Sequence, residues 1–256
     1  MKISIYTLGC KTNQFESQAM EKLLSEKGFE IVPFDEAADA YIINSCTVTA
    51  VADKKTKQAI RRIKREHRGA LVAVCGCMAQ LNPEAVKREL DADIVGGNRN
   101  HIAFIEEIER SLKNKEVDGG GSFGCGEFCA LPAGGLLGRT RALLKIEDGC
   151  DNYCSYCIIP YARGRVRSLP FERAVAEAAR LSEEGYREIV LTGIEISSYG
   201  KDLDEGRTIC DLTEAICAAA KGSRISLGSL KPTVITDEFC KRLSRCENLC
   251  RHIHLS

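Results

Sequence analysis

The amino-acid sequence predicts an α/β protein with an N-terminal doubly wound parallel-sheet domain followed by a partial (β/α) barrel. Short apolar runs alternate with helical patterns of apolar residues over residues 1–113, and the same alternation restarts at residue 139. A glycine-rich stretch, residues 114–138, separates the two patterns and predicts a flexible connector. Alternation of strands with helices is typical of parallel sheets, which bind ligands at the carboxyl ends of their strands.

The first domain is predicted to contain four strands and four main helices. The apolar runs that predict strands are residues 3–8, 40–44, 71–74 and 94–95. Helical patterns cover about 13–27, 51–66, 83–90 and 102–112. Asn13 and Glu16 have the spacing of a capping box, and Asn82 before Pro83 is a favourable helix start.

The second domain is predicted to repeat the alternation as part of a barrel. Strands are expected at 142–146, 188–192 and 224–230, and another begins at 252. Helices are expected at 171–184, from near Asp211, where Glu214 completes a capping-box spacing, and at 236–245. The active site of such a barrel lies at the carboxyl ends of its strands.

Composition narrows the class of protein. The chain has 256 residues, is 44% hydrophobic and 28% charged, and has a formal net charge of zero, so an RNA-binding site must be a local patch. No apolar run approaches the roughly 20 residues that span a bilayer, and no signal peptide is recognisable, so we expect a cytoplasmic protein that does not bind a membrane. In that compartment, 14 cysteines indicate metal or thiol chemistry rather than disulfides.

Three cysteines follow three of the predicted strands in the first domain. Cys10, Cys46 and Cys77 each come directly after an apolar run, so a parallel sheet should bring them to one edge, near helix N-termini. They are candidate metal ligands, although three buried cysteines acting as small hydrophobic residues remain the alternative. Cys75 lies inside the strand run and is expected in the core, whereas Cys125 and Cys129, in the connector, are expected to be incidental thiols.

A second group of cysteines follows the first strand of the second domain. Cys150, Cys154 and Cys157 have the spacing C-x3-C-x2-C in a loop. Three thiolates suit an iron–sulfur cubane, which leaves one of its four irons open to another ligand. A closed zinc site needs a fourth protein ligand, and none lies nearby in sequence. Zinc binding and plain packing are the alternatives.

Two further features are ambiguous. The predicted helix at 51–66 and the residues just after it are basic, and only Asp53 and Glu66 offset the charge there. The basic residues are Lys54, Lys55, Lys57, Arg61, Arg62, Lys64, Arg65 and Arg68. Such a face can bind RNA phosphates or can be merely solvated. His101 is expected to be an ordinary surface or cap residue, and Arg163, Arg165 and Arg167 are expected either to approach a substrate or phosphate or to be solvated.

The cysteine motifs resemble those of a known family. C-x3-C-x2-C after a strand, with Tyr156 before the last cysteine, resembles the signature of radical S-adenosylmethionine (SAM) enzymes. The longer string CDNYCSYCIIPYARGR, from Cys150 to Arg165, resembles the radical SAM methylthiotransferases. The contexts LGCKTN, NSCTV and GCMAQ around Cys10, Cys46 and Cys77 resemble the three-cysteine domain of the same family.

The resemblance implies two [4Fe-4S] clusters and SAM as cofactors. Cys150, Cys154 and Cys157 would hold the cluster at which one electron cleaves SAM, and Cys10, Cys46 and Cys77 would hold an auxiliary cluster that carries the sulfur to be methylated. Tyr156, Thr192 and Gly193 would contact SAM, although a glycine turn after a buried strand is the alternative for Gly193. In the family an acidic residue usually stands where this chain has Lys231.

The resemblance also implies a substrate and partners. The string GCKTNQFE from Gly9 to Glu16 is similar to the branch that acts on N6-threonylcarbamoyladenosine beside the tRNA anticodon. The partners would be the tRNA anticodon stem-loop, SAM and a reductant such as flavodoxin or ferredoxin. Alternatives are methylthiolation of isopentenyladenosine in tRNA or of a ribosomal-protein Asp, a zinc-binding RNA adaptor, or an inactive fragment. Because family members continue beyond the last predicted strand, we expect a truncated chain without the C-terminal RNA-binding domain.

Overall fold

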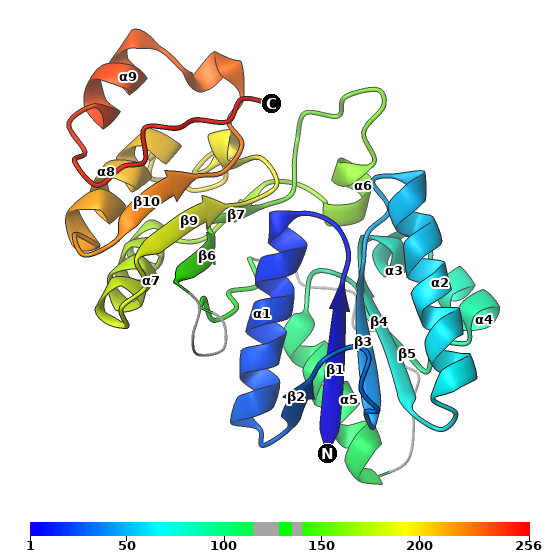
Figure 1. The fold of residues 1–256 in the computed structure, drawn as a ribbon. Coiled ribbons are helices and arrows are strands. Elements are labelled where there is room, and N and C mark those ends of the chain that lie inside the picture. The colour runs from blue at the N-terminus through cyan, green and yellow to red at the C-terminus, as the bar shows by residue number, and fades with distance from the viewer. Residues whose placement is uncertain (115–127, 135–139) are drawn as a thin grey trace. The chain divides into compact units, whose positions relative to one another are not determined.

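A computed structural model of the chain describes residues 1–114, 128–134 and 140–256 (Figure 1). These residues form two compact units. Unit 1 comprises Met1–Pro132 together with Cys154–Arg163, and unit 2 comprises Ala133–Tyr153 together with Gly164–Ser256. Most of the predicted connector, including Cys125, lies outside the described residues.

Unit 1 is built on a five-stranded parallel sheet. Its strands are β1 (Lys2–Thr7), β2 (Glu30–Val32), β3 (Ala40–Ser45), β4 (Leu71–Gly76) and β5 (Ile94–Val95). They lie in the order β2-β1-β3-β4-β5, and every pairing is parallel. The expected parallel sheet is therefore confirmed, and the short edge strand β2 is an element that the sequence pattern did not predict. Because β1, β3 and β4 are adjacent, their carboxyl ends share one stretch of the sheet edge.

Helices cover both faces of this sheet. They are α1 (Lys11–Glu26), α2 (Ala50–Glu66), α4 (Pro83–Leu90) and α5 (His101–Asn114). The short helix α3 (Cys77–Leu81) directly follows β4, and α6 (Ile159–Arg163), from the later segment, packs on α3. Met20 of α1 and Ile108 of α5 pack with Ile42 on one face. Ile60 of α2 and Val86 of α4 pack against the opposite face. Alternate residues of each strand thus enter two separate apolar cores, as a doubly wound sheet requires.

Unit 2 contains a three-stranded parallel sheet in the order β10-β9-β6. Its strands and helices are β6 (Arg141–Lys145), β7 (Glu147–Asp148), β8 (Arg167–Ser168), α7 (Phe171–Glu183), β9 (Glu188–Thr192), α8 (Ile209–Ala219), β10 (Arg224–Leu227) and α9 (Asp237–Leu243), with short 3-10 turns η1 (Ile196–Ser198) and η2 (Pro232–Val234). The expected strand near residue 252 is reduced to an isolated bridge between Leu230 and Leu255. The parallel alternation of the predicted barrel is confirmed for its first three strands.

Two predicted helix caps are wrong. Helix α1 begins at Lys11 rather than Asn13, and its N-cap residue is Cys10, which makes no side-chain capping bond. In α8 the capping box is formed by Thr208 and Asp211, so the helix begins earlier than the spacing of Asp211 and Glu214 indicated. In both helices a polar residue of the first turn resembled a cap in sequence, because N-cap and first-turn positions favour similar residue types.

A small hairpin also escaped prediction. Strands β7 and β8 pair antiparallel and flank the segment that carries the second cysteine group. Each strand has two residues, too few for an alternating pattern to be visible in sequence. Across the three described ranges of the chain, no helix has the length and apolar character needed to span a membrane.

Candidate functional site

Three cysteines of unit 1 lie at the carboxyl ends of neighbouring strands. Cys10 follows β1 and caps α1, Cys46 directly follows β3, and Cys77 directly follows β4 as the first residue of α3. Cys10 is exposed, whereas Cys46 and Cys77 are 5% and 2% exposed. Pairing of β1, β3 and β4 thus brings the three predicted thiols to one sheet edge, as the sequence indicated.

Two glycines allow these strand ends to approach each other. A Cβ atom added to Gly9 would lie 2.9 Å from Cβ and 3.1 Å from Sγ of Cys46. A Cβ atom on Gly76 would lie 2.3 Å from the backbone oxygen of Ser45, and Gly76 has φ of +90°. Only glycine therefore suits both positions, each of which immediately precedes a cysteine of the group.

We expect Gly76→Ala to destabilise unit 1 by about 2–3 kcal/mol, because it adds a backbone clash to an unfavourable positive φ. Gly28→Ala is the matched control, since Gly28 also has a positive φ, of +86°, but no atom lies within 4 Å of the added Cβ. Urea denaturation of both variants measures the difference. Equal losses of stability would show that the close approach at Ser45 is unimportant.

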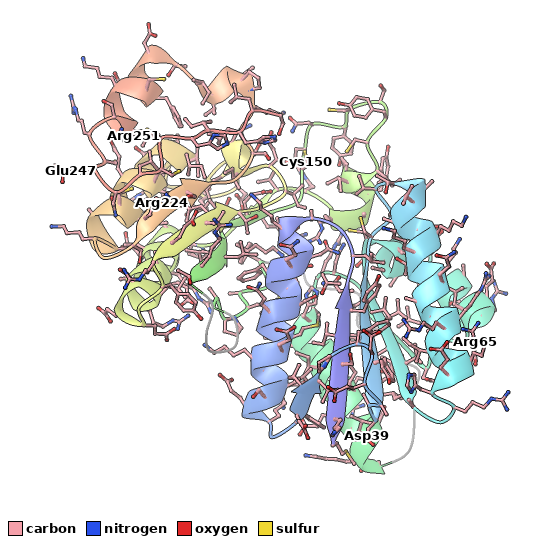
Figure 2. The ribbon with its side chains drawn as sticks, viewed as in Figure 1. Asp39, Arg65, Cys150, Arg224, Glu247 and Arg251 are labelled. Atoms are coloured by element: carbon pink, nitrogen blue, oxygen red, sulfur yellow. The ribbon has the colours of Figure 1, made fainter. Side chains whose placement is uncertain are left out.

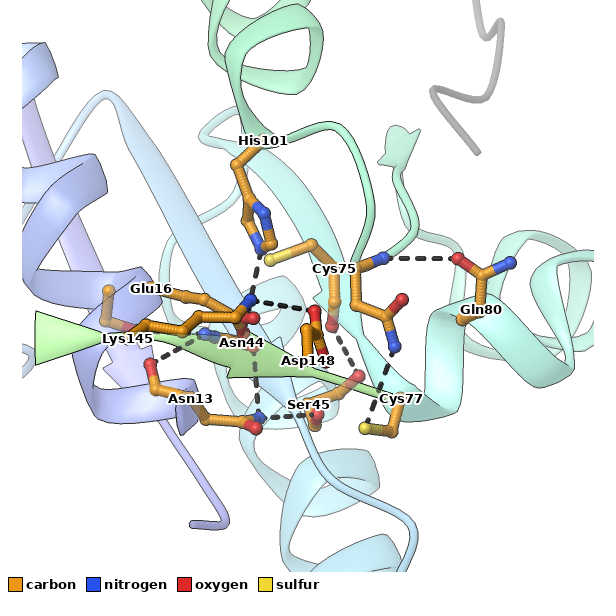
Figure 3. A network of polar contacts seen from close by, with 12 residues as sticks. Asn13, Glu16, Asn44, Ser45, Cys75, Cys77, Gln80, His101, Lys145 and Asp148 are labelled. Carbon is orange, nitrogen blue, oxygen red and sulfur yellow. Dashed lines mark hydrogen bonds and ion pairs between the residues drawn. The ribbon is translucent and has the colours of Figure 1, made fainter. Parts of the chain in front are cut away.

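A buried amide network joins the same strand ends (Figure 3). The side-chain nitrogen of Asn13 donates to the backbone oxygens of Leu8 and Ser45, at 3.0 and 3.1 Å, and to Oδ1 of Asn44 at 3.2 Å. Asn44 in turn donates to the backbone oxygen of Asn13 at 3.0 Å. Sγ of Cys10 donates to Oδ1 of Asn13 at 3.4 Å. Asn13 is thus a buried clamp between the cysteine-bearing loops rather than a helix cap.

Cys75 and Cys77 lie in different surroundings. Cys75 is fully buried within β4 and packs in the apolar core, as expected, and burial raises the pKa of its thiol well above the usual value. Burial also raises the pKa of the Cys77 thiol, which the Arg163 guanidinium lowers in part. Nδ2 of Asn98 lies 3.9 Å from Sγ of Cys77. Polar partners therefore surround Cys77, whereas Cys75 is a core residue.

The donor set at this edge fits an iron–sulfur cluster. Three thiols follow neighbouring strand ends at this edge, glycines allow their loops to approach, and thiolate is the ligand that such clusters take. In the described part of the chain, however, no group of three or more His, Cys, Asp or Glu side chains is placed to hold a metal ion. The thiols gather at one edge without enclosing a common centre.

Cys150 follows the β7 strand of unit 2 and is 9% exposed. Its backbone nitrogen donates to the oxygen of Gly164 at 3.0 Å, and its Sγ accepts from Nδ2 of Asn152 at 3.0 Å. A Cβ atom on Gly149 would lie 2.0 Å from the backbone oxygen of Arg165, so glycine is required directly before this cysteine. The hairpin of β7 and β8 therefore fixes Cys150 at the start of its loop.

Cys154 and Cys157 lie in a tight turn that belongs to unit 1. The backbone nitrogen of Cys157 donates to the oxygen of Cys154 at 2.9 Å. Cys154 is exposed, Cys157 is half-buried, and Tyr156 is 91% exposed. The two thiols and the tyrosine ring are therefore accessible. Figure 2 labels Cys150, the member of this second group that lies in unit 2.

The end of β9 packs closely on a buried carboxyl group. Thr192 is 2% exposed, and a Cβ atom on Gly193 would lie 2.7 Å from Oε2 of Glu147. The same Oε2 atom accepts the backbone N–H of Glu195 at 2.7 Å. Oε1 of Glu147 is buried without a hydrogen-bond partner among the described residues. Burial raises the pKa of Glu147 to about 8. This buried acid lies directly beside Gly193, the predicted SAM contact, and was not predicted from the sequence.

Lys231, at the position where the resemblance leads us to expect an acidic residue, has an acidic partner. Nζ of Lys231 lies 3.1 Å from Oε2 of Glu195. The same carboxylate oxygen accepts from Nδ2 of Asn152 at 3.3 Å, and Asn152 also contacts Cys150. An acidic side chain is thus present beside the Cys150 loop, although it comes from the β9 end rather than from position 231.

Arg163 and His101 are buried, contrary to the prediction from the sequence. Arg163 is fully buried, and its guanidinium donates to Oε1 of Glu16 at 2.7 Å and to Oδ1 of Asn13 at 2.8 Å. His101 is 1% exposed, with Nε2 3.8 Å from Oε2 of Glu16, so its assignment as a surface or cap residue is wrong. Arg165 is a solvated side chain by contrast, with 82% of its surface exposed.

Acidic residues outside α2 contribute to its charge balance. Nζ of Lys64 binds Asp93 at 3.0 Å, and Arg62 lies 3.3 Å from Asp35. Arg65, labelled in Figure 2, pairs with Glu66 at 2.6 Å. The statement that only Asp53 and Glu66 offset this helix is therefore wrong. Among the basic residues of α2 and the two positions after it, those without an ion pair to another described residue are Lys54, Lys55, Arg61 and Arg68.

Comparison with known proteins agrees with this architecture. Residues 2–97 match the uncharacterized protein family UPF0004, and residues 144–256 match the Radical SAM superfamily. The threonylcarbamoyladenosine tRNA methylthiotransferase MtaB of Bacillus subtilis is 36% identical over 99% of this chain and 56% of its own length. The protein of the same name from Thermotoga maritima is 37% identical, over 99% of this chain and 57% of its own length.

A solved structure shares the fold. The radical S-adenosylmethionine methyltransferase TsrM of Kitasatospora setae, whose structure contains cobalamin and a [4Fe-4S] cluster, aligns with a TM-score of 0.60 at 14% identity. The alignment covers 100% of this chain and 60% of that one.

Two α/β units, each with cysteines at a strand end, thus occur in a chain whose C-terminal part matches the Radical SAM superfamily. Over nearly its whole length the chain is similar to tRNA methylthiotransferases, with the UPF0004 match before the Radical SAM match. It spans a little over half the length of the two relatives described above.

Proposed function

We propose that this chain is part of a tRNA methylthiotransferase that converts N6-threonylcarbamoyladenosine beside the anticodon to its 2-methylthio derivative. The observation that carries the proposal is the convergence of Cys10, Cys46 and Cys77 at one sheet edge, in a chain that also has the radical SAM cysteine motif. The names of the two bacterial relatives support the choice of substrate.

The proposal assigns the two groups of cysteines separate roles. Cys10, Cys46 and Cys77 would hold an auxiliary [4Fe-4S] cluster, and Cys150, Cys154 and Cys157 the cluster that binds SAM. When bound, the second cluster supplies the electron that cleaves SAM, and the first carries the sulfur that is methylated. In this scheme a reductant such as flavodoxin or ferredoxin provides the electron. Each group has three thiols, which leaves one iron of a cubane open for SAM or sulfur.

Other side chains of the loop ends would orient SAM. Gly193 packs so closely on Glu147 that an added Cβ atom would lie 2.7 Å from Oε2 of that residue, so glycine is required at this strand end. The proposal takes Thr192 and Gly193 as contacts of SAM and Tyr156 as an exposed aromatic surface beside it. Asn152 donates to Sγ of Cys150 and to Glu195, and so holds the thiol in one orientation.

The exposed basic residues of α2, together with Arg68 just beyond its end, are the proposed RNA contact of unit 1. Lys54, Lys55, Arg61 and Arg68 are exposed and lack ion pairs with other described residues, so they can bind phosphates. The basic side chains of this helix that already form ion pairs are expected to bind phosphate more weakly, because the phosphate must displace their acidic partners. A tRNA substrate also implies that the protein works in the cytoplasm.

The decisive experiment is mass spectrometry of tRNA nucleosides from cells that lack the gene. We expect loss of the 2-methylthio form of threonylcarbamoyladenosine and recovery on complementation. Loss of the 2-methylthio form of isopentenyladenosine instead would support the methylthiolation reaction but contradict threonylcarbamoyladenosine as the substrate. Unchanged tRNA with loss of a methylthiolated ribosomal-protein Asp would move the protein to a different branch.

Anaerobic purification tests the cofactor assignment separately. We expect a brown protein with about eight irons per chain, the content of two cubane clusters. A colourless protein that contains zinc instead of iron would contradict the enzyme and support a metal-binding RNA adaptor.

A further inference from the structure

The segment that carries the last two cysteines of the second group belongs to the unit that holds the three-cysteine site. Residues Cys154–Arg163 form one compact unit with the N-terminal sheet, and α6 packs on α3, the helix that begins at Cys77. Nδ2 of Asn98 donates to the backbone oxygen of Ala162 at 2.9 Å and also lies near Sγ of Cys77. The last turn of this segment therefore touches the surroundings of a proposed cluster ligand.

Arg163 makes the strongest of these contacts. Its guanidinium binds both carboxylate oxygens of Glu16, at 2.7 and 3.1 Å, and Oδ1 of Asn13 at 2.8 Å. Arg163 and Glu16 are both 0% exposed. A two-pronged, fully buried ion pair has one favourable geometry, so it fixes α6 against α1. Asn13 is the same residue that clamps Leu8, Asn44 and Ser45 together.

Arg163 therefore interacts with two of the three thiols, with Cys77 directly and with Cys10 through Asn13. Oδ1 of Asn13 also accepts from Sγ of Cys10, and the Arg163 side chain hydrogen-bonds Cys77. The guanidinium is thus a buried positive charge beside a site whose thiolates, and any cluster that they hold, are negative. Its place in the chain, six residues after Cys157, connects the two cysteine groups covalently through one short segment.

We propose that Arg163 is a positioning residue of the N-terminal three-cysteine site, which it holds through Glu16 and Asn13, supplies with a countercharge, and ties to the Cys154–Cys157 turn. This inference deepens the proposed function, because it takes Cys10, Cys46 and Cys77 to hold an iron–sulfur cluster. The Arg163–Glu16 pair is itself independent of any cluster, so the two ideas can be tested separately.

The first test uses the chain without iron and measures amide hydrogen exchange by mass spectrometry. Arg163→Met should raise exchange in peptides that cover residues 10–16 and 158–163 by about tenfold, because loss of the ion pair lets α6 and α1 open locally. Arg163→Lys should restore part of the protection. Arg65→Met removes an exposed, paired arginine and is the matched control, with no effect expected on these peptides.

The second test measures the charge. In a chain with Cys150, Cys154 and Cys157 changed to Ala, only the N-terminal site can hold a cluster. Removing a nearby positive charge disfavours reduction, so Arg163→Met should make the midpoint potential more negative by about 59 mV, a tenfold change in a one-electron equilibrium. Glu16→Gln should shift it in the positive direction, whereas Arg163→Lys and Arg65→Met should leave it nearly unchanged.

Opposite shifts for Arg163→Met and Glu16→Gln would support the countercharge, since a merely structural defect would not reverse its sign. Equal shifts in both, or the same exchange in Arg163→Met and Arg65→Met, would overturn the proposal. The double variant Arg163→Met with Glu16→Gln removes both buried charges and provides a folded comparison if the single variant is unstable. If the parent chain binds no iron, both the proposed cluster at the N-terminal site and the countercharge role of Arg163 are refuted. The hydrogen-exchange result would still decide whether Arg163 positions the loops.

Discussion

Changing Cys150, Cys154 and Cys157 to Ala should remove about four of about eight irons per chain and abolish any release of 5′-deoxyadenosine from SAM. Changing Cys10, Cys46 and Cys77 should remove a similar amount of iron but retain SAM cleavage, because these thiols lie in the N-terminal site. Iron analysis, electron paramagnetic resonance and chromatography of the nucleoside product measure the three quantities on anaerobically reconstituted protein.

Two other cysteines provide the controls for these variants. Cys240 is exposed on α9 and belongs to neither group, so Cys240→Ala should keep the full iron content. Cys75 is buried in the apolar core only two positions from Cys77, and Cys75→Ala should also keep its iron while losing some stability. Loss of four irons in Cys75→Ala with none in Cys77→Ala would show that the ligand within this pair has been assigned wrongly.

Much of this site could be predicted because it depends on strand order and little else. The apolar runs that end before Cys10, Cys46 and Cys77 are buried strands, and parallel pairing of β1, β3 and β4 necessarily brings their carboxyl ends together. The positions of Cys75 in the core and of Cys77 at the strand end follow from the same pattern. The connector and the domain boundaries stay predictions, since residues 115–127 and 135–139 lie outside the described chain.

The residues that sequence analysis missed depend on long-range pairing. Arg163 is 147 positions from Glu16 and 150 from Asn13, and no local pattern distinguishes a buried arginine from a solvated one. Asn13 was interpreted as a helix cap because its residue type suits that place, but the fold uses its amide to bind two neighbouring loops. Glu147 lies between apolar strand residues and the cysteine loop, where an acid is expected to be exposed.

We expect the buried carboxyl group of Glu147 to make the folded chain less stable as pH rises. Its pKa is raised from 4.5 to about 8, mainly by burial and partly by the negative charge of Asp148. The N–H groups of Glu195 and Ile194 and the Lys145 ammonium act in the opposite direction. Between these two pKa values the folded chain binds a proton that the unfolded chain has released. The free energy of unfolding therefore decreases with rising pH across this window, by up to about 4 kcal/mol.

Glu147→Gln should remove this pH dependence, because a neutral amide occupies the same place without a proton to lose. The midpoint of urea unfolding of the iron-free chain, measured from about pH 5 to about pH 9 at constant ionic strength, should fall for the parent and stay nearly level for the variant. The variant should consequently be the more stable protein at the alkaline end. Hydrogen exchange in β9 should follow the same trend, since Glu147 lies against the end of that strand.

Glu188 is the matched control, because it is a carboxyl group of unit 2 with the opposite shift. Burial tends to raise its pKa, but hydrogen bonds from Ser226 and Arg141 prevail and lower it. Glu188→Gln should therefore cost stability near neutral pH and leave the alkaline decline in place. An equally steep decline in Glu147→Gln would show that Glu147 is ionised in the folded chain. The buried acid beneath Gly193 would then be a permanent negative charge beside the proposed SAM contacts, rather than a neutral hydrogen-bonding group.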